Sequence, residues 1–426
     1  MKLPEKPFDW HPEYQNNFGK FMAKKELWKM AHEFNKRYLY WSELKYRVKD
    51  ENERKQLWTI MKFLRSSKYE MIPFPTLWFQ YYPLSDFIKE LHLFDKSLAG
   101  NIEIQQKTLG LHKRYIISSL MEEAIASSMI EGASTTRRVA KTMLKERRKP
   151  KNKSEKMIVN NYETMQFIVS KKDEALTPEM LLEIQKMVTH DTLDDPKDEE
   201  QFRDNNEVVV GHQLHSDIIA HHPPDFKQLP KLIKEFCDFA NNEGEKFIHP
   251  ILKGITLHFL LGYIHPFNDG NGRTARSVFY WYMLSKGYWL FEYMAVSRRI
   301  LRSRKQYDLA YLHTEYDEFD LTYFFKYIIE CIDDALKDML EHIKKKQVEQ
   351  AEAKKIISEN PDLSLRQAMI LEEFMKSPNK AFSVKEISET FRVVLQTART
   401  DLLHLEEKGF ITKRKSGKTH YFYLKE

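Results

Sequence analysis

The stretch from His265 to Arg276, HPFNDGNGRTAR, combines residue types that suit the binding of a polyphosphate. Gly270 and Gly272 adopt positive φ angles at little cost, so the turn can direct several backbone N–H groups inward around an anion. A helix that begins near Arg273 adds unpaired N–H groups and the positive end of its dipole at the same place. Asn271 can donate a further hydrogen bond from its side chain. The turn therefore predicts a phosphate site between two helices.

Charged side chains in the same stretch extend this chemistry. Arg273 and Arg276 are three residues apart, so both guanidinium groups can reach a polyphosphate from one side of the helix. Asp269 offers a hard oxygen ligand beside these anions, which is typical of a Mg²⁺ ion that bridges phosphate oxygens. His265 ends the preceding helix and can act as the base that removes a proton from an incoming hydroxyl.

Each of these residues also has a plainer interpretation. A lone histidine before a proline most often ends a helix, and a lone GNG sequence is usually just a turn. A base, a carboxylate, two glycines and two arginines within twelve positions are nevertheless hard to explain by packing. Other phosphate motifs fail, because the chain has neither a GxxxxGK[ST] loop nor a kinase-like glycine loop with an HRD segment.

The twelve residues match the signature HxFx(D/E)GNGRxxR of the Fic family at every defined position. The chain resembles the Fic protein adenylyltransferases over about residues 84–332. This resemblance implies ATP as the substrate, Mg²⁺ as the cofactor and an unidentified protein hydroxyl as the acceptor of AMP. It assigns general-base chemistry to His265, Mg²⁺ binding to Asp269, the inner phosphates to Gly270, Asn271 and Gly272, the outer phosphates to Arg273 and Arg276, and anchoring of the loop to Phe267.

A second motif, SSMIEG from Ser127 to Gly132, matches the inhibitory pattern (S/T)xxxE(G/N) of that family. On a helix over residues 113–132, Ser127 and Glu131 are one turn apart and share a face. Glu131 could then pair with Arg276, whose guanidinium group would otherwise bind the γ-phosphate. The plainer alternative is an exposed glutamate before a helix-ending glycine. Beside a complete Fic loop, the motif implies an enzyme that is inhibited by its own chain.

Residues 201–224 differ from the helical pattern around them. Three valines at 208–210 favour a strand, and Gly211 follows them, so we predict a small hairpin. The resemblance implies that this flap, with Val209, Val210 and Gly211, pins a target peptide beside the nucleotide, and that Tyr307 lies near the adenine. Four histidines in or near the flap fit no usual zinc spacing and have no cysteine nearby, so we interpret them as flap and loop residues: His212, His215, His221 and His222.

Helical periodicity dominates the rest of the chain. We expect helices within residues 18–64 and over residues 84–98, 113–130, 155–169, 177–189, 226–241, 247–264, 273–286, 297–314 and 321–345. Prolines interrupt the pattern at 71–83, and the charged run at 145–156 is typical of a surface connection. The expected fold class is mainly α, with a Fic helical core, a small β-hairpin flap and a C-terminal winged-helix module.

The C-terminal pattern has the order of a winged helix, with helices over 365–376, 384–391 and 395–408 and strands over 410–414 and 420–424. Its third helix and wing carry basic residues where winged helices meet DNA phosphates, namely Arg392, Arg399, Lys413, Arg414, Lys415 and Lys418. Acidic residues on the same helix oppose such contact, so DNA and protein stand as equal candidate partners. The predicted domains are an N-terminal helical region (1–83), the Fic core (84–345), a linker (346–363) and the winged helix (364–426).

Bulk composition sets wider limits. A chain of 426 residues is long enough for two or three domains, and a net charge of +6 permits contact with nucleotides without demanding it. The two cysteines are far apart and suggest neither disulfides nor a thiolate metal site. The N-terminus lacks the pattern of a secretory peptide, and no window approaches the roughly 20 apolar residues of a membrane span. We therefore expect a soluble, cytoplasmic protein, with a second copy of the chain as a further candidate partner.

Two alternative functions stay open at this point. The Fic core could sense a nucleotide while the winged helix regulates DNA. The core could also transfer another group, such as UMP or phosphocholine, because the loop recognises phosphates and reads the base only weakly.

Overall fold

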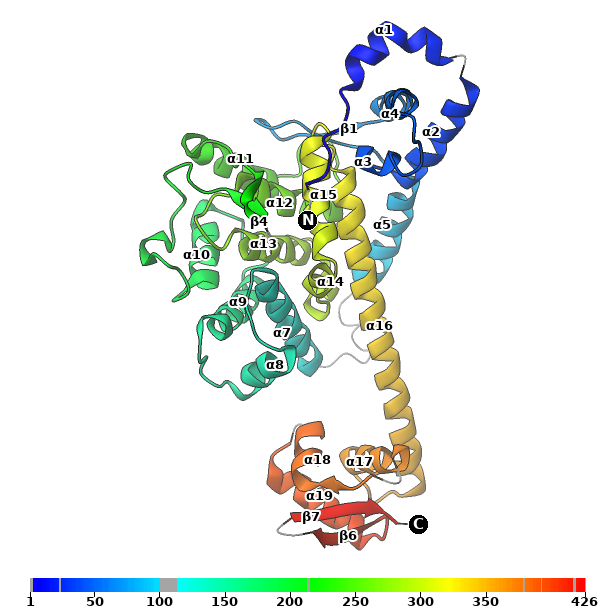
Figure 1. The fold of residues 1–426 in the computed structure, drawn as a ribbon. Coiled ribbons are helices and arrows are strands. Elements are labelled where there is room, and N and C mark those ends of the chain that lie inside the picture. The colour runs from blue at the N-terminus through cyan, green and yellow to red at the C-terminus, as the bar shows by residue number, and fades with distance from the viewer. Residues whose placement is uncertain are drawn as a thin grey trace. The chain divides into compact units, whose positions relative to one another are not determined.

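The computed structural model describes residues 3–22, 24–99, 113–212, 215–377, 380–391, 393–416 and 419–425. The chain divides into two compact units, Met1–Lys337 and Asp338–Glu426 (Figure 1). Helices dominate both units, as the sequence predicted, and the strands form small sheets. Among the described residues, no helix is both long enough and apolar enough to traverse a lipid bilayer.

Short helices and one hairpin open the first unit. They are α1 (Trp10–Met22), α2 (Lys25–Arg37), α3 (Trp41–Leu44), α4 (Glu51–Ser66), β1 (Glu70–Ile72), β2 (Phe79–Tyr81) and α5 (Ser85–Leu98). The β1–β2 hairpin occupies the proline-rich interruption and was not predicted. A buried ion pair ties this region to the rest of the unit, because the Lys62 ammonium on α4 lies 2.8 Å from the carboxylate of Asp317.

The helices that carry the Fic-like motifs follow. They are α7 (Lys113–Ile130), α8 (Arg137–Glu146), α9 (Lys153–Ser170), α10 (Pro178–Thr189), α11 (Leu229–Asn241), α12 (Pro250–Ile264), α13 (Asn271–Ser285), α14 (Val296–Arg302), α15 (Arg304–Tyr316) and α16 (Thr322–Glu359). A helix that is apolar all round must be enclosed, and α12 is buried along almost its whole length against α13 and its neighbours (Figure 1). This buried pair positions the turn between them.

The predicted flap is a hairpin of β3 (Val210–His212) and β4 (His215–His221), antiparallel, with Val210 opposite His221. The described residues of this unit also form three short 3₁₀ helices, Pro196–Asp198, Phe226–Gln228 and Trp289–Tyr293. Two expectations need correction. The single helix expected over 297–314 is broken at Ser303 into α14 and α15, because the backbone of Ser303 leaves the helical region. The charged run at 145–156 is a connection only in its middle, because α8 and α9 take its two ends.

The second unit has the winged-helix order of elements. These are α17 (Leu365–Lys376), β5 (Phe382–Ser383), α18 (Val384–Phe391), α19 (Leu395–Glu407), β6 (Ile411–Ser416) and β7 (Thr419–Leu424), in a sheet of order β5-β7-β6. Strand β5 was not predicted. The segment expected as a linker, 346–363, is helical up to Glu359 because α16 continues through it. Arg392 and Lys418 lie outside the described residues.

Candidate active site

The turn between α12 and α13 is held together from within. His265 caps α12 in the left-handed region with φ 48°, and Gly270 precedes α13 with φ 88°. The expectation of a positive φ at Gly272 was wrong, because this glycine lies in the first turn of α13. The Asn271 side-chain amide accepts from the N–H of Phe267 at 3.0 Å and donates to its carbonyl at 2.7 Å. The fully buried Phe267 ring stacks on Phe202. Phe267 thus anchors the loop as expected, but the Asn271 side chain is committed to the loop and does not point a donor at an anion site.

Arg276 on α13 is buried, with 2% of its surface exposed. Its Nε donates to Ser127 Oγ at 2.8 Å, and its Nη2 donates to the Ser127 carbonyl at 3.0 Å and to Glu131 Oε1 at 2.8 Å. The contact that the SSMIEG motif predicted is therefore present. Arg276 Nη1 is buried and has no hydrogen-bond partner among the described residues, so one donor of this fork remains free for a ligand.

The Glu131 carboxylate also lies against the glycine turn. A Cβ atom added to Gly272 would overlap with Glu131 Oε1, so the carboxylate rests where this glycine leaves the loop open. Desolvation raises the pKa of the Glu131 carboxyl, but the charges of Arg276 and Arg304 outweigh it, and the pKa is lowered overall. Arg304 also donates to the carbonyl of Ile130 at 2.6 Å. A negative group of this chain thus faces the expected anion site.

His265 meets the requirements of a base. Burial is the main cause that lowers the pKa of its imidazole to about 4, so the ring is neutral near pH 7. Its Nδ1 lies 3.2 Å from the Gly262 carbonyl, which can only accept. The neutral tautomer with the proton on Nδ1 leaves the lone pair on Nε2. That nitrogen can take a proton from a hydroxyl.

Asp269 is exposed at the turn, whereas its neighbour Arg273 is buried. The Asp269 side chain is 54% exposed, and its Oδ1 accepts from the N–H of Gly270 at 2.5 Å and from Arg273 Nη2 at 3.5 Å. Arg273 also donates to the Val188 carbonyl, while its buried Nε has no partner among the described residues. One accessible carboxylate at the turn fits a Mg²⁺ ion that takes its other ligands from water and phosphate. No group of three or more metal-ligating side chains occurs among the described residues, and no zinc site was expected.

A cavity of about 380 Å³ brings some of the predicted residues together, whereas Ser127, Asp269, Gly270, Asn271 and Arg273 do not line it. The predicted residues that line it are Glu131, Val210, Gly211, His265, Gly272, Arg276 and Tyr307. The hydroxyl of Tyr307 lies 2.8 Å from Nε2 of His258, and this contact fixes the position of the phenol ring. Burial lowers the pKa of His258 to about 3. Val209 is 39% exposed and does not line the cavity. The phosphate-turn, inhibitory and flap motifs thus share one cavity.

Sequence reasoning missed three further residues around this cavity. Arg203 donates from Nε to the His265 carbonyl at 2.9 Å. His221 in the flap lies 2.8 Å from a carboxylate oxygen of Glu315 on α15. In the sequence, His221 stands out only as one of four histidines in or near the flap, and their spacing fits no usual zinc site. Arg203 belongs to no motif.

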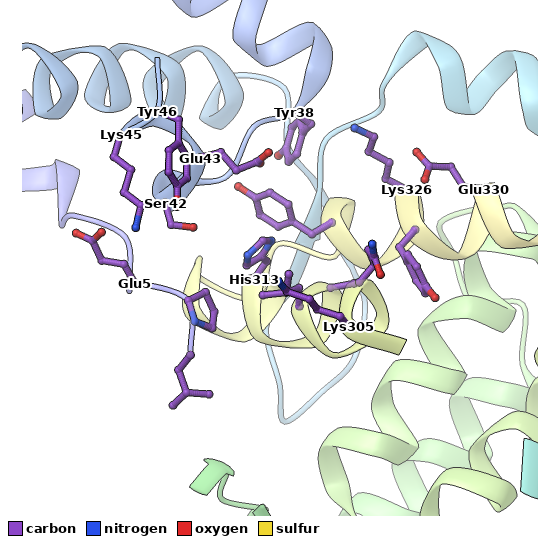
Figure 2. A pocket seen from close by; sticks show the side chains of 17 residues that line it. Glu5, Tyr38, Ser42, Glu43, Lys45, Tyr46, Lys305, His313, Lys326 and Glu330 are labelled. Carbon is purple, nitrogen blue, oxygen red and sulfur yellow. The ribbon is translucent and has the colours of Figure 1, made fainter. Parts of the chain in front are cut away.

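A larger cavity of about 560 Å³ lies elsewhere in the first unit, between α3, α15, α16 and the segment before α1 (Figure 2). Its lining mixes lysines and glutamates, including Lys45, Lys305 and Lys326 with Glu5 and Glu330. It holds none of the motif residues. The smaller cavity is therefore the candidate active site.

Two segments of the chain match known protein families. Residues 175–283 match the model of the Fic/DOC family, and residues 366–419 match that of the DeoR-like helix-turn-helix domain. The chain therefore contains a Fic/DOC family domain followed by a DeoR-like helix-turn-helix domain. The fold agrees with that of a Fic family protein from Desulfovibrio desulfuricans (TM-score 0.52, 18% identity, 80% of this chain and 95% of that one) and of Fic-1 from C. elegans (0.51, 17%, 76% and 86%).

Several proteins named protein adenylyltransferase Fic are similar in sequence to parts of this chain. That of Drosophila willistoni is 36% identical over 94 residues, which are 22% of this chain and 17% of the relative. That of Culex quinquefasciatus is 31% identical over 165 residues (39% and 29%), and that of Nematostella vectensis is 24% identical over 225 residues (51% and 48%). The matches thus span less than half of each relative's length.

Proposed function

We propose that this protein transfers AMP from ATP to a serine, threonine or tyrosine hydroxyl of another protein, and that Glu131 inhibits the transfer. The observation that carries the proposal is the cavity in which a neutral His265 and the buried Arg276 meet at a glycine turn. The names of the relatives support AMP as the transferred group.

The chain's own residues suffice to describe the transfer. His265 Nε2 accepts the proton of the target hydroxyl as its oxygen bonds to the α-phosphorus, and the bond from that phosphorus to the bridging oxygen breaks, which releases pyrophosphate. Backbone N–H groups around Gly270 and Gly272 and the forks of Arg273 and Arg276 hold the phosphates. Asp269 would hold Mg²⁺, which neutralises phosphate charge when bound.

Inhibition follows from the contacts of Arg276. A γ-phosphate needs the guanidinium face that Glu131 occupies, and the Glu131 carboxylate would repel it. ATP can then enter only in a pose that does not present its α-phosphorus to the attacking hydroxyl. Withdrawal of Glu131 is the step that a cellular signal would control.

The test uses labelled ATP with Mg²⁺. We expect Glu131→Gly to label itself or a protein in a cell lysate, and Glu131→Gly with His265→Ala to lose that label. Intact-mass measurement of the product separates AMP from UMP or phosphocholine. If neither wild type nor Glu131→Gly adds any group, the proposal is wrong.

A second candidate function rests on the DeoR-like match at residues 366–419. Here the second unit binds DNA and the Fic core responds to a nucleotide. Sequence-selective DNA binding that survives His265→Ala and changes with ATP would favour it.

Both cysteines are buried and free, which is consistent with the cytoplasmic location that we propose. A homodimer stays a proposal that sedimentation can test.

A further inference from the structure

The C-terminal end of α12 has an unusual set of caps. The last carbonyls of a helix lack partners within the helix, and they lie at the negative end of its dipole. Here Nε2 of His221 lies 2.8 Å from the Tyr263 carbonyl. Arg203 donates from Nη2 to the Ile264 carbonyl at 3.5 Å and from Nε to the His265 carbonyl at 2.9 Å. Two basic side chains thus cap three consecutive carbonyls that end at the proposed base.

Both caps come from the segment that contains the flap. Arg203 precedes the hairpin and also donates to the Pro224 carbonyl, just after it. Its own N–H donates to the Pro266 carbonyl at 2.9 Å. Arg203 therefore joins the two ends of the flap segment to the residues on either side of the base.

His221, the last residue of β4, is held on its other side by α15. Its Nδ1 lies 2.8 Å from Glu315 Oε2, and its side chain is only 7% exposed. One ring nitrogen thus faces the Glu315 carboxylate and the other faces the Tyr263 carbonyl, so the ring bridges α15 and α12. The flap, α12 and α15 meet at this one side chain.

We propose that Arg203 and His221 form a clamp, with Glu315 as its support, that fixes the flap and the catalytic His265 in one geometry. The inference rests on the proposed transfer reaction. The clamp residues are positioning residues, because among the described residues their hydrogen bonds go to the carbonyls at the end of α12, to Pro266, to the flap segment and to each other, and none goes to Gly270, Gly272 or Arg276. Their role is to present His265 Nε2 and the flap-held target hydroxyl to each other.

Two physical features of His265 explain why its position needs support from the clamp. His265 has a left-handed backbone, which a residue with a Cβ adopts only when its surroundings enforce it. The charges around its ring also matter: burial lowers its pKa most, His221 and Arg203 lower it further, and Glu131 alone among the recorded charges raises it. The clamp therefore helps to keep the base unprotonated as well as aligned.

The experiment compares clamp variants in the Glu131→Gly background. For His221→Ala and Arg203→Lys we expect AMP transfer at saturating ATP to fall by about 30-fold, because small misplacements of reacting groups cost up to about a hundredfold. The dissociation constant of Mg-ATP should stay within about threefold, since the phosphate turn keeps its contacts. Glu315→Gln keeps the shape of the support and should give a smaller loss. The matched control is His222→Ala, the exposed neighbour of His221, which should transfer at the parent rate.

The pH profile is the readout that a merely structural role would not move. Protonated His265 cannot act as a base, and the parent lacks Glu131, which raises the pKa of His265 toward about 4 in the wild type, so transfer by the parent should fall only below about pH 4. The His221 imidazole is one of the groups that lower the pKa of His265, so His221→Ala should raise that pKa and move the acid limb to higher pH. Arg203→Lys keeps the charge and should shift the limb less.

The outcomes separate the two proposals. If the Glu131→Gly parent transfers no group, the proposed function is wrong, and the clamp is then judged from nitrogen NMR signals of the His265 ring, which should change in His221→Ala but not in His222→Ala. If the parent is active, an unchanged rate and acid limb in His221→Ala would overturn the clamp. If His221→Ala lowers Tm and Mg-ATP affinity together with the transfer rate, the clamp is also overturned, because such parallel losses indicate a structural role alone.

Discussion

The phosphate turn and the wing both carry basic side chains, yet they hold them in opposite ways. Arg273 and Arg276 are 1% and 2% exposed, and each is fixed by hydrogen bonds to oxygens of the chain. Lys413 and Arg414 on β6 are exposed, and their recorded contacts are a 3.3 Å ion pair with Glu406 and a cation–π contact with Tyr423. Fixed, desolvated forks recognise one geometry, whereas exposed charges attract any polyanion and are screened by salt.

The comparison also gives a physical reason for the inhibition that we propose for Glu131. A buried guanidinium group without a partner is costly, so Arg276 needs an acceptor whether or not a nucleotide is bound. Ser127 and Glu131 on α7 provide that acceptor. The wing has no such requirement because water satisfies its charges.

The largest expected effect is on the base itself. In the Glu131→Gly background, His265→Ala should lower AMP transfer by about 10³-fold, because a positioned general base contributes on that order. Mg-ATP affinity by calorimetry should be unchanged, since His265 caps α12 and does not hold phosphate. An exposed histidine, His190→Ala, is the control. A loss of less than tenfold would show that another group takes the proton.

The next effect concerns the inhibitory contact. Glu131→Gly should raise transfer by about 10²-fold, because hydrogen bonds to charged groups are worth roughly 1.5–3 kcal/mol and this one competes with the γ-phosphate. Glu131→Gln keeps the bulk against Gly272 but loses the charge, so it should give an intermediate rate. Initial rates with labelled ATP test this order. Equal rates for all three proteins would mean that Glu131 does not inhibit.

Much of this arrangement could be predicted because it is local in sequence. The turn at 265–276, helix α7 and the hairpin of the wing each depend on residues a few positions apart. The break at Ser303 and the β1–β2 hairpin could not be predicted, because both have distant partners. Ser303 Oγ lies 2.9 Å from the Tyr327 hydroxyl, and Gln80 on β2 exchanges backbone hydrogen bonds with Phe319 and Leu321. The capping by Arg203 and His221 joins residues more than 40 positions apart, and no periodicity records such contacts.

A smaller effect is expected at the wing. Lys413→Gln with Arg414→Gln should weaken binding of duplex DNA by about tenfold at low salt and lower the slope of log affinity against log salt by about 2, because each lost phosphate contact removes about one released counterion. AMP transfer to a protein should not change. Lys385→Gln on α18, whose side chain is 80% exposed, is the control. If wild type shows no salt-dependent DNA binding, the unit is better assigned to protein contact.

The smallest effect is expected at the ion pair of Asp401 with Arg366, in which the acidic residue is the buried partner. At the active site the buried member is Arg276 and the partner Glu131 is 30% exposed, whereas in the second unit the buried member is Asp401, 3% exposed, and its partner Arg366 is 43% exposed. Asp401 accepts from Arg366 at 2.5 and 3.1 Å and from Gln367 at 3.3 Å. Asp401→Asn removes the charge but keeps an acceptor, and Arg366 can hydrate instead. We therefore expect a loss of only about 1 kcal/mol in the unfolding free energy of this unit. Hydrogen exchange of peptides from residues 365–425 measures it, with the exposed Glu389→Gln as the control, and a loss above about 3 kcal/mol would mean that the second unit depends on its buried charge as strongly as a fully buried pair does.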